Sequence, residues 1–394
     1  MTTAAHYQFR ITRLVSTLPV HRAFHWLHLH QPQLRLWLLE LLAIPAPTFE
    51  EGARAQWFLD RFTALGLSNV HLDAAGNALA ELSPPDARED APITLLSAHL
   101  DTVFPSGTPT IPTEEGSIIR GPGSCDNGPG LTGLLAIAAA LRYANITPPT
   151  PILFAANVGE EGEGDLRGMR HLFKTGPYAK RIQAAIALEG AGTGAVVTSA
   201  LGSLRFRLTA TGPGGHSWTD AGTPNPIQHL ARALTALESV PLPDQPRTTL
   251  NIGRIEGGTS INSIPERATA LLDLRSTSPT QLLLTETHLR AVLDPHPITL
   301  ELIGDRPAAA LPPDAPLLQT VRAVDRHLGL RTEPCIGSTD ANIPLSLDVP
   351  AIAIGTGGTG GGIHTLAEWY DPTGRELALR RILLTLLDTL PAAD

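Results

Sequence analysis

The sequence contains little cysteine and little lysine. Two of its 394 residues are cysteines, so disulfide bonds cannot form the scaffold of the fold. Lys174 and Lys180 are the only lysines, which leaves few candidates for a Schiff-base lysine or for the lysine of a phosphate-binding loop. Hydrophobic residues make up 42% of the chain. This share is ordinary for a globular protein with a sizeable core.

Long apolar runs and excess positive charge are also absent. No apolar stretch reaches the roughly 20 residues that a membrane-spanning helix needs. The net charge of −9 argues against nucleic acid as the main partner. The first 39 residues carry four arginines and no acidic residue. This composition has some transit-peptide character, but a helix packed on the body fits it equally well, and no apolar core of a secretory signal is present. We expect a cytoplasmic protein without a membrane or nucleic-acid partner, with residues 1–32 as an N-terminal extension.

Two patterns of secondary structure follow one another along the chain. Between residues 33 and 200, apolar runs such as Ile93–Ala98 alternate with helical segments, which predicts an α/β domain with a largely parallel sheet covered on both faces. Residues 201–305 have the order β-α-β-β-α-β, typical of a small α+β, ferredoxin-like domain. Residues 306–394 return to the first pattern. We therefore predict a three-layer α/β domain (33–200 and 306–394) interrupted by an inserted lid (201–305).

One acidic residue lies in a loop dense in glycine and proline. Gly121–Gly130 reads GPGSCDNGPG, and Asp126 is its only acid. Glycine and proline impose an irregular backbone there, so Asp126 is either a turn residue or a bridge between two metal ions. We interpret Cys125 beside it as a packing residue, because a nucleophilic cysteine needs an activated thiolate. The role of Asp126 depends on whether other parts of the chain supply further ligands.

Such ligands occur at the carboxyl ends of predicted strands, where open α/β sheets bind their ligands. In chain order, the candidate residues are His99, Asp101, Asp126, Glu160, Glu161, Glu189 and His364. Each one alone is more often a surface residue. Together, two histidines and three carboxylates suit two divalent ions that share Asp126, with zinc favoured and cobalt or manganese as alternatives. Two such ions about 3.5–4 Å apart can hold a bridging water and polarise a carbonyl group.

These motifs resemble those of the M20 family of co-catalytic metallopeptidases and amidohydrolases, from about residue 34 to the C-terminus. They are SAHLDTV (97–103), GPGSCDNGPG (121–130), GEEGEG (159–164), ALEG (187–190), GGHS (214–217), GGTSINSIP (257–265), TDANIP (339–344) and GGGIHTLAE (360–368). The resemblance implies a zinc-exopeptidase-like catalytic domain with two Zn²⁺ per subunit. It also implies a lid through which the chain forms a homodimer.

The resemblance assigns the metal ligands one by one. His99, Asp126 and Glu189 would hold one zinc ion, and Asp126, Glu161 and His364 would hold the other. The peptide bond that follows Asp126 is expected to be cis, as is typical of the family.

The remaining site residues take catalytic or substrate-binding roles by the same resemblance. Glu160 would be the general base that deprotonates the bridging water, and Asp101 would orient the first histidine ligand. His216 in the lid would stabilise the oxyanion in the partner subunit's site. Asn262 would contact the substrate, and Arg275 would grip a substrate carboxylate.

Four further residues have weaker signals. Thr48 and Glu51 have the spacing of a capping box, so we expect a helix to begin at Thr48. Asp340 in TDANIP and Glu368 in GGGIHTLAE precede and follow the last ligand, His364, and each fits a supporting role beside it. Asp340 fits a turn residue as well.

Three functions remain open. A carboxypeptidase or deacylase acting on an N-acyl amino acid or a di- or tripeptide is favoured, because Glu189 stands where aminopeptidase members usually have aspartate. A di- or tripeptide aminopeptidase is the alternative, because GEGDLRGMRHLF (162–173) looks like the tripeptidase-type members. A non-catalytic binding protein with the same fold is the remote alternative, disfavoured by the intact ligand set and Glu160.

Overall fold

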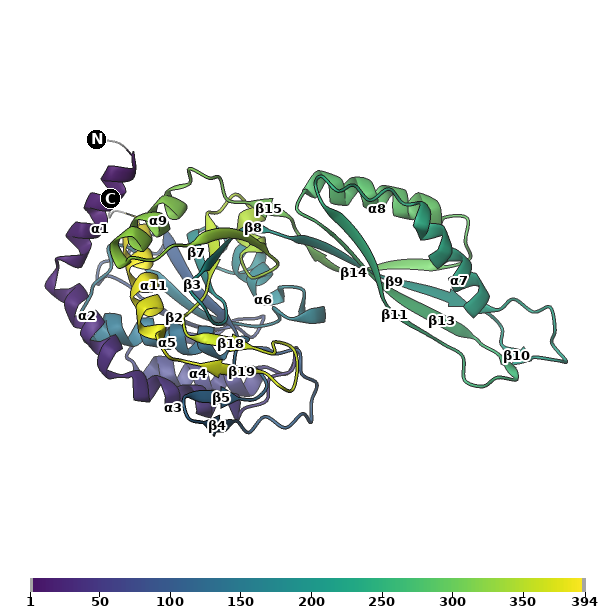
Figure 1. Cartoon of the computed structure of the whole chain (residues 1–394), viewed down its shortest axis with the longest axis horizontal. Coiled ribbons are helices and arrows are strands. Elements are labelled where there is room, and N and C mark those ends of the chain that lie inside the picture. Colours follow the sequence, from purple (N-terminus) through teal and green to yellow (C-terminus); the bar gives the residue numbers. More distant parts are fainter. Residues whose placement is uncertain (1–2, 392–394) are drawn as a thin grey trace. The chain divides into compact units, whose positions relative to one another are not determined.

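The computed structural model describes residues 3–391, and the chain divides into two compact units. Unit 1 comprises Met1–Ser199 and Ala310–Asp394, and unit 2 comprises Ala200–Ala309. Figure 1 shows both units, coloured along the sequence. Among the described residues, none of the helices combines the length and the apolar character that crossing a membrane requires.

Unit 1 is built on a mixed nine-stranded sheet. Its strands are β1 (Ser68–Leu72), β2 (Ala78–Leu82), β3 (Ile93–His99), β6 (Ile152–Asn157), β7 (Ile182–Leu188), β8 (Ala195–Ala200), β15 (Ala309–Ala310), β16 (Glu333–Gly337) and β17 (Ala351–Ile354). The order is β1-β2-β6-β3-β7-β17-β8-β15, with β16 paired to β8. The four central strands run parallel, and β2 and β8 run antiparallel to their central neighbours. The predicted α/β fold with a mixed, largely parallel sheet is confirmed.

Helices cover this sheet. They are α4 (Gly52–Ala64), α5 (Gly128–Tyr143), α6 (Arg167–Arg170), α9 (Pro316–Leu328), α10 (Asn342–Ser346) and α11 (Arg375–Thr389). Helix α5 is apolar on every side and is buried from Gly128 to Leu141, because it contacts the sheet and also α2, α3 and α11. Helix α6 is shorter than predicted, since a π-helical turn replaces its end at His171–Thr175.

The N-terminal extension is helical and packs on unit 1. Its described part forms α1 (Thr3–Val15) and α2 (Leu18–Leu29), and α3 (Gln31–Leu42) begins at its end. The buried Ile11 and Val20 join a cluster with residues of α9 and α11, and the Arg10 side chain donates to Asp388 Oδ1 over 2.9 Å. In Figure 1, α1 and α2 run along one side of unit 1, next to α9 and α11.

A small four-stranded sheet in unit 1 joins two distant parts of the chain. It consists of β18 (Thr359–Gly361), β19 (Trp369–Asp371), β5 (Ile118–Arg120) and β4 (Thr113–Glu115), paired in that order. The loop between β18 and β19 carries His364, and the loop after β5 carries Asp126. The sequence patterns did not predict this sheet, because its strands are only three residues long.

Unit 2 has the predicted β-α-β-β-α-β order. Its main elements are β9 (Gly202–Thr211), α7 (Pro226–Ala236), β11 (Thr248–Gly257), β13 (Arg267–Ser276), α8 (Pro279–Leu293) and β14 (Thr299–Arg306). The strands form an antiparallel sheet in the order β11-β13-β9-β14, which is a ferredoxin-like arrangement. Leu204, Phe206 and Leu208 alternate with polar residues along β9, and this apolar face packs under α7 and α8.

Candidate metal centre

His99 is the last residue of β3, and its side chain is only 1% exposed. The ring nitrogen Nδ1 lies 3.1 Å from the backbone oxygen of Asp101 and 3.6 Å from its Oδ1. The other nitrogen, Nε2, faces two acids, at 3.0 Å from Asp126 Oδ1 and 3.4 Å from Glu189 Oε1. A histidine that binds a metal through one nitrogen is commonly held through the other. The position of Asp101 fits this use of His99.

The carboxylate of Asp126 faces both predicted histidine ligands. Its Oδ1 lies 3.0 Å from His99 Nε2, and its Oδ2 lies 3.1 Å from His364 Nε2. Glu161 Oε1 is also 3.1 Å from His364 Nε2. Each oxygen of Asp126 therefore points toward a different histidine, which is the arrangement of a carboxylate that joins two metal positions.

The donor atoms lie close enough together to hold metal ions. Three groups have donor atoms within 4.8 Å of one another: His99 with Asp126 and Glu189, Asp126 with Glu161 and His364, and His99 with Glu160 and Glu161. Zinc–nitrogen and zinc–oxygen bonds of about 2.0–2.2 Å place two ligands of one ion roughly 3–4 Å apart. The nitrogen–oxygen distances of 3.0–3.4 Å fit this spacing, so the residues present fit a pair of divalent ions.

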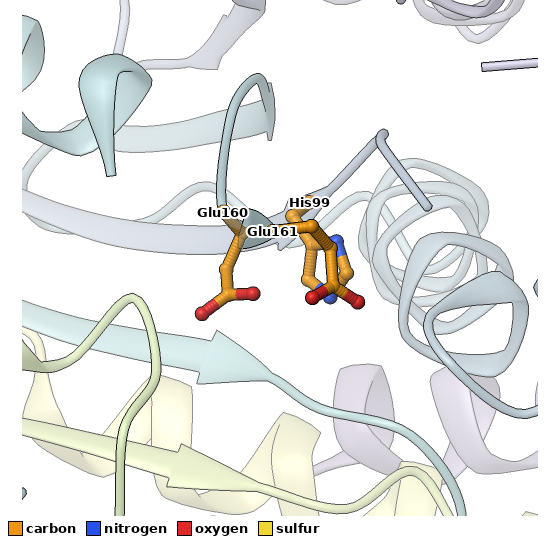
Figure 2. A group of neighbouring side chains, drawn as sticks. All are labelled: His99, Glu160 and Glu161. Carbon is orange, nitrogen blue, oxygen red and sulfur yellow. The ribbon is translucent and has the colours of Figure 1, made fainter. Parts of the chain in front are cut away.

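Glu160 and Glu161 are neighbours in the chain but point in different directions. In Figure 2, the carboxylate of Glu161 lies beside the ring of His99, whereas that of Glu160 lies to one side of it. A carboxylate oxygen of each glutamate is within 4.8 Å of a His99 ring nitrogen. Both side chains belong to buried residues at the carboxyl end of β6. Glu161 therefore belongs to the groups formed with His99 and with His364, whereas Glu160 belongs only to the one formed with His99 and Glu161.

Asp101 holds the loop that carries these two glutamates. Its Oδ1 accepts a hydrogen bond from the backbone N–H of Glu160 at 3.0 Å, and its Oδ2 accepts one from Glu161 at 2.8 Å. The Thr48 hydroxyl also donates to Oδ2, at 2.9 Å. Burial by itself would raise the pKa of Asp101. The interactions of its carboxylate with His99 and with these N–H groups outweigh burial, so the pKa of Asp101 is lowered. Asp101 is therefore a buried anion that fixes one histidine and one loop.

The predicted capping box at Thr48 is wrong. Helix α4 begins at Gly52, with Glu51 as its N-cap and without a side-chain cap. Thr48 instead donates to Asp101, and Glu51 Oε1 accepts a hydrogen bond from the N–H of Gly159 at 3.1 Å. Both side chains that resembled a helix signal support the loops of the metal centre.

The loop that carries Asp126 is tied to β7 by the next residue. Asn127 Nδ2 donates to the Leu188 oxygen at 2.8 Å, and Asn127 Oδ1 accepts from the N–H groups of Gly190 and Gly130. A Cβ at Gly130 would lie 2.0 Å from Asn127 Oδ1, so this contact requires glycine. Helix α5 begins at Gly128, directly after Asn127 as its N-cap. The peptide bond Asp126–Asn127 is cis, as predicted.

Burial and neighbouring charge shift the protonation of the cluster. Burial raises the pKa of Glu161 to about 8 and that of Glu189 to about 7. The hydrogen bond to Asp126, together with Glu161, raises the pKa of His364 to about 9. Burial also disfavours the ionised form of Asp126, but the hydrogen bonds to His364 and His99 outweigh it and hold the pKa of Asp126 well below its usual range. Without a metal cation, the cluster therefore retains protons near neutral pH.

Metal binding is therefore expected to release protons and to strengthen as the pH rises from about 6 to 9. Glu161, Glu189 and His364 hold protons up to pKa values of about 8, about 7 and about 9, and a cation must displace those protons. Calorimetric titration of the metal-free protein with Mn²⁺ in two buffers of different ionisation enthalpy measures the release. Equal affinity at pH 6 and pH 8.5, with no buffer dependence, would contradict this prediction.

The three predicted site residues of the lid belong to unit 2. His216, in β10 (Gly215–His216), is exposed, and its Nδ1 accepts from the N–H of Trp218 at 3.2 Å. Asn262 lies beside it, because β10 pairs with β12 (Ser263–Ile264) and the Asn262 oxygen accepts from the N–H of Ser217. The structure thus brings His216 and Asn262 together within unit 2.

Arg275 lies near the other end of β13. Eight residues separate it from Arg267 at the start of the strand, or about 26 Å at the usual rise of about 3.3 Å per residue. Its Nε donates to Asp273 Oδ2 at 2.6 Å. Arg275 is therefore far from His216 and Asn262 within unit 2.

Several residues around the site were assigned no role, or a different one, from the sequence. They are Thr48, Glu51, Arg54, Asn127 and Asn157. Asn157 Nδ2 donates to the buried Asp340 at 2.8 Å, and burial raises the pKa of Asp340 to about 8. Burial likewise raises the pKa of Cys125 to about 11, in keeping with a packing residue. For Asn127 and Asn157, the sequence indicates a supporting role only through their position next to Asp126 and near Glu160.

Comparison with known families identifies the chain. The model of peptidase family M20/M25/M40 matches residues 95–388. This protein belongs to the M20 family. The resemblance inferred from the motifs is therefore confirmed, and the matched residues include all five candidate metal ligands and the whole of unit 2.

Relatives within the M20 family differ in their reported activities. A probable carboxypeptidase of Aspergillus clavatus is 29% identical over 256 residues, covering 60% of this chain and 56% of that protein. A succinyl-diaminopimelate desuccinylase of Bordetella parapertussis is 28% identical over 269 residues, covering 62% of this chain and 69% of that protein. The chain thus spans about half the length of the carboxypeptidases it matches.

A solved structure shares the fold along most of the chain. The tripeptidase of Staphylococcus aureus superimposes with a TM-score of 0.71 at 22% identity, covering 90% of this chain and 96% of that one. At this identity the similarity concerns the fold only.

Proposed function

We propose that this M20 protein is a dinuclear metal hydrolase that cleaves an amide or peptide bond in a small substrate. Zinc is the favoured metal, with cobalt or manganese as alternatives. The observation that carries the proposal is the position of Asp126, whose two oxygens lie 3.0 and 3.1 Å from the two histidines. Unit 1 is proposed as the catalytic domain, and unit 2 as the lid through which the chain forms a homodimer.

The side chains are proposed to take the roles that the resemblance to the M20 family implies, and their positions are compatible with these roles. When bound, a pair of divalent ions polarises a carbonyl group and lowers the pKa of a water molecule. Glu160, which is separate from the ligands, takes the proton of the attacking water and delivers it to the leaving amine. His99, Asp126, Glu161, Glu189 and His364 serve as the ligands. Asp101 keeps His99 and the Glu160 loop in place, because it accepts hydrogen bonds from that loop.

The favoured substrate is an N-acyl amino acid or a di- or tripeptide with a free carboxylate. Glu189 supports the carboxypeptidase or deacylase type, and the carboxypeptidase and desuccinylase relatives agree with it. Arg275 is proposed to bind the substrate carboxylate, since a guanidinium can donate two parallel hydrogen bonds to one. His216 is proposed to stabilise the oxyanion, and Asn262 to contact the substrate.

A substrate panel distinguishes this function from an aminopeptidase. We expect the metal-loaded protein to hydrolyse N-blocked dipeptides and N-acyl amino acids at least as fast as dipeptides with a free amine. The panel is run with added Zn²⁺, Mn²⁺ or Co²⁺, and kcat/KM is compared. Activity confined to substrates with a free amine would establish the aminopeptidase instead. No turnover with any substrate or metal would favour a binding protein.

The Arg275→Ala variant extends the same assay. We expect KM to rise about tenfold or more for substrates with a free carboxylate, the loss of a charge-assisted contact worth about 1.5–3 kcal/mol, and little change for the matching amides. Arg254→Ala, which removes another arginine of the same sheet that pairs with Glu256 on its own strand, is the control. An unchanged KM for the carboxylate substrates would remove Arg275 from the substrate site.

A further inference from the structure

Glu368 has a buried carboxylate that accepts several hydrogen bonds from the backbone of the Asp126 loop. Its side chain is 0% exposed. Oε1 accepts hydrogen bonds from the N–H groups of Cys125 at 2.8 Å and Asp126 at 2.7 Å, and Oε2 accepts one from Gly123 at 2.9 Å. Glu368 comes four residues after His364 in the same loop. One side chain thus links the segment of the last histidine ligand to the backbone of the shared aspartate.

These three hydrogen bonds restrain a glycine-rich segment, in addition to the bond that Asn127 makes to β7. The Asp126 loop is rich in glycine, and Gly121 and Gly123 have φ values of +149° and +77°, so its backbone has many accessible conformations. A carboxylate that accepts several backbone N–H groups forms strong, charge-assisted bonds. The backbone oxygen of Glu368 also accepts a hydrogen bond from the N–H group of Gly121, at 3.1 Å. The loop is therefore attached to the Glu368 segment at four points.

A buried arginine lies between this carboxylate and Asp101. Arg54 is 1% exposed, and its guanidinium donates to the backbone oxygens of Ile44 and Leu100, each at 2.8 Å. A Cβ at Gly123 would lie 3.7 Å from Arg54 Nη2. Burial lowers the pKa of Arg54 to about 10, while the charges of Asp101 and Glu368 act in the opposite direction. Arg54 thus remains a cation at neutral pH and balances two buried carboxylates.

We propose that Glu368 is the positioning residue that sets Asp126 relative to His364, so that one carboxylate reaches both metal positions, with Arg54 as its buried counter-charge. This inference rests on the proposed dinuclear site. Glu368 acts through the backbone of Asp126 and makes no contact with the ions or the substrate. Its loss should therefore affect metal binding first and catalysis only as a consequence.

The Glu368→Gln variant tests the inference with the metal alone. Glutamine keeps the size of the side chain but turns an N–H₂ group toward at least one backbone N–H, so at least one of the three bonds is lost. We expect Mn²⁺ affinity to fall about 10–100-fold, the usual cost of losing a group that orients metal ligands. We also expect the exchange coupling between paired Mn²⁺ ions, seen by electron paramagnetic resonance in the wild-type protein, to weaken or disappear.

The controls separate this inference from the proposed function. Glu333→Gln, at an exposed glutamate paired with Arg331, should bind Mn²⁺ like the wild-type protein. If the wild-type protein binds no metal, the proposed function fails. If the wild-type and Glu368→Gln proteins bind two coupled Mn²⁺ ions with equal affinity, only the role of Glu368 fails.

A measurement on the wild-type protein covers the case in which Glu368→Gln does not fold. Hydrogen exchange of the metal-free protein reports on the backbone N–H groups of Gly123, Cys125 and Asp126. We expect them to be protected even without metal, because their acceptor belongs to the protein. Exchange at the rate of free peptide, while α5 remains protected, would overturn the proposal.

Discussion

Replacing Glu160 with glutamine is expected to lower kcat by about 10²–10⁴-fold, the usual contribution of a general base, and to leave the metal content unchanged. Glutamine has nearly the same shape but cannot accept the proton of the attacking water. The carboxylate of Glu160 lies to one side of His99, whereas that of Glu161 lies beside the ring. Turnover of the preferred substrate and metal analysis of the same sample provide the two readouts.

The neighbouring Glu163 supplies a matched control. It is an exposed acid in the same loop, and Glu163→Gln should retain wild-type kcat and metal content. If Glu160→Gln keeps its full activity, Glu160 is not the base. If it loses metal together with activity, Glu160 acts as a ligand, as its grouping with His99 and Glu161 would permit.

The second large effect is expected for Asp126→Ala, which should lose both metal ions and all measurable activity. Asp126 is the one residue common to the two groups formed with Glu189 and with His364, so its removal deprives each metal position of a ligand. The imidazoles of His99 and His364 would also lose the carboxylate that both of them contact. Metal analysis after dialysis against a small excess of Zn²⁺ measures the loss.

Stability provides an independent readout of the same variant. A ligand that binds only the folded state stabilises it by mass action, by about 2.7 kcal/mol at 100 times its Kd. Added metal should therefore raise the Tm of the wild-type protein but not that of Asp126→Ala. The exposed Asp86→Ala serves as the control. Retention of one tightly bound ion by Asp126→Ala would show that the aspartate is not shared.

The sequence predicted that the candidate ligands at strand ends lie close together, because those strand ends were recognisable. The apolar runs that became β3, β6 and β7 each end at a candidate ligand, and parallel pairing brings these ends to one edge of the sheet. In the register, His99 is directly opposite Asn157, three residues before Glu160. Short-range patterns thus indicated which residues meet, since parallel strands leave little freedom in the placement of their ends.

The supporting residues were harder to predict, because their partners are distant in the sequence. Glu368 and Asp126 are separated by 242 positions, and no local pattern connects them. Thr48 and Glu51 had a local pattern, but it indicated the wrong structure: tertiary hydrogen bonds to Asp101 and Gly159 replaced the helix cap. Local signals identify elements, whereas the hydrogen bonds that orient a site depend on the assembled fold.

The position of β17 in the sheet has a consequence for biosynthesis. Ala351–Ile354 pairs between β7 and β8, so the large sheet stays divided until this late segment leaves the ribosome. Unit 2 is contiguous, from Ala200 to Ala309, and all its strands are available earlier. At a translation speed of about 5–20 residues per second, about 8–30 s pass between the emergence of β8 and that of β17. During that interval the nascent chain holds four of the five proposed ligands, but the fifth, His364, has not yet emerged.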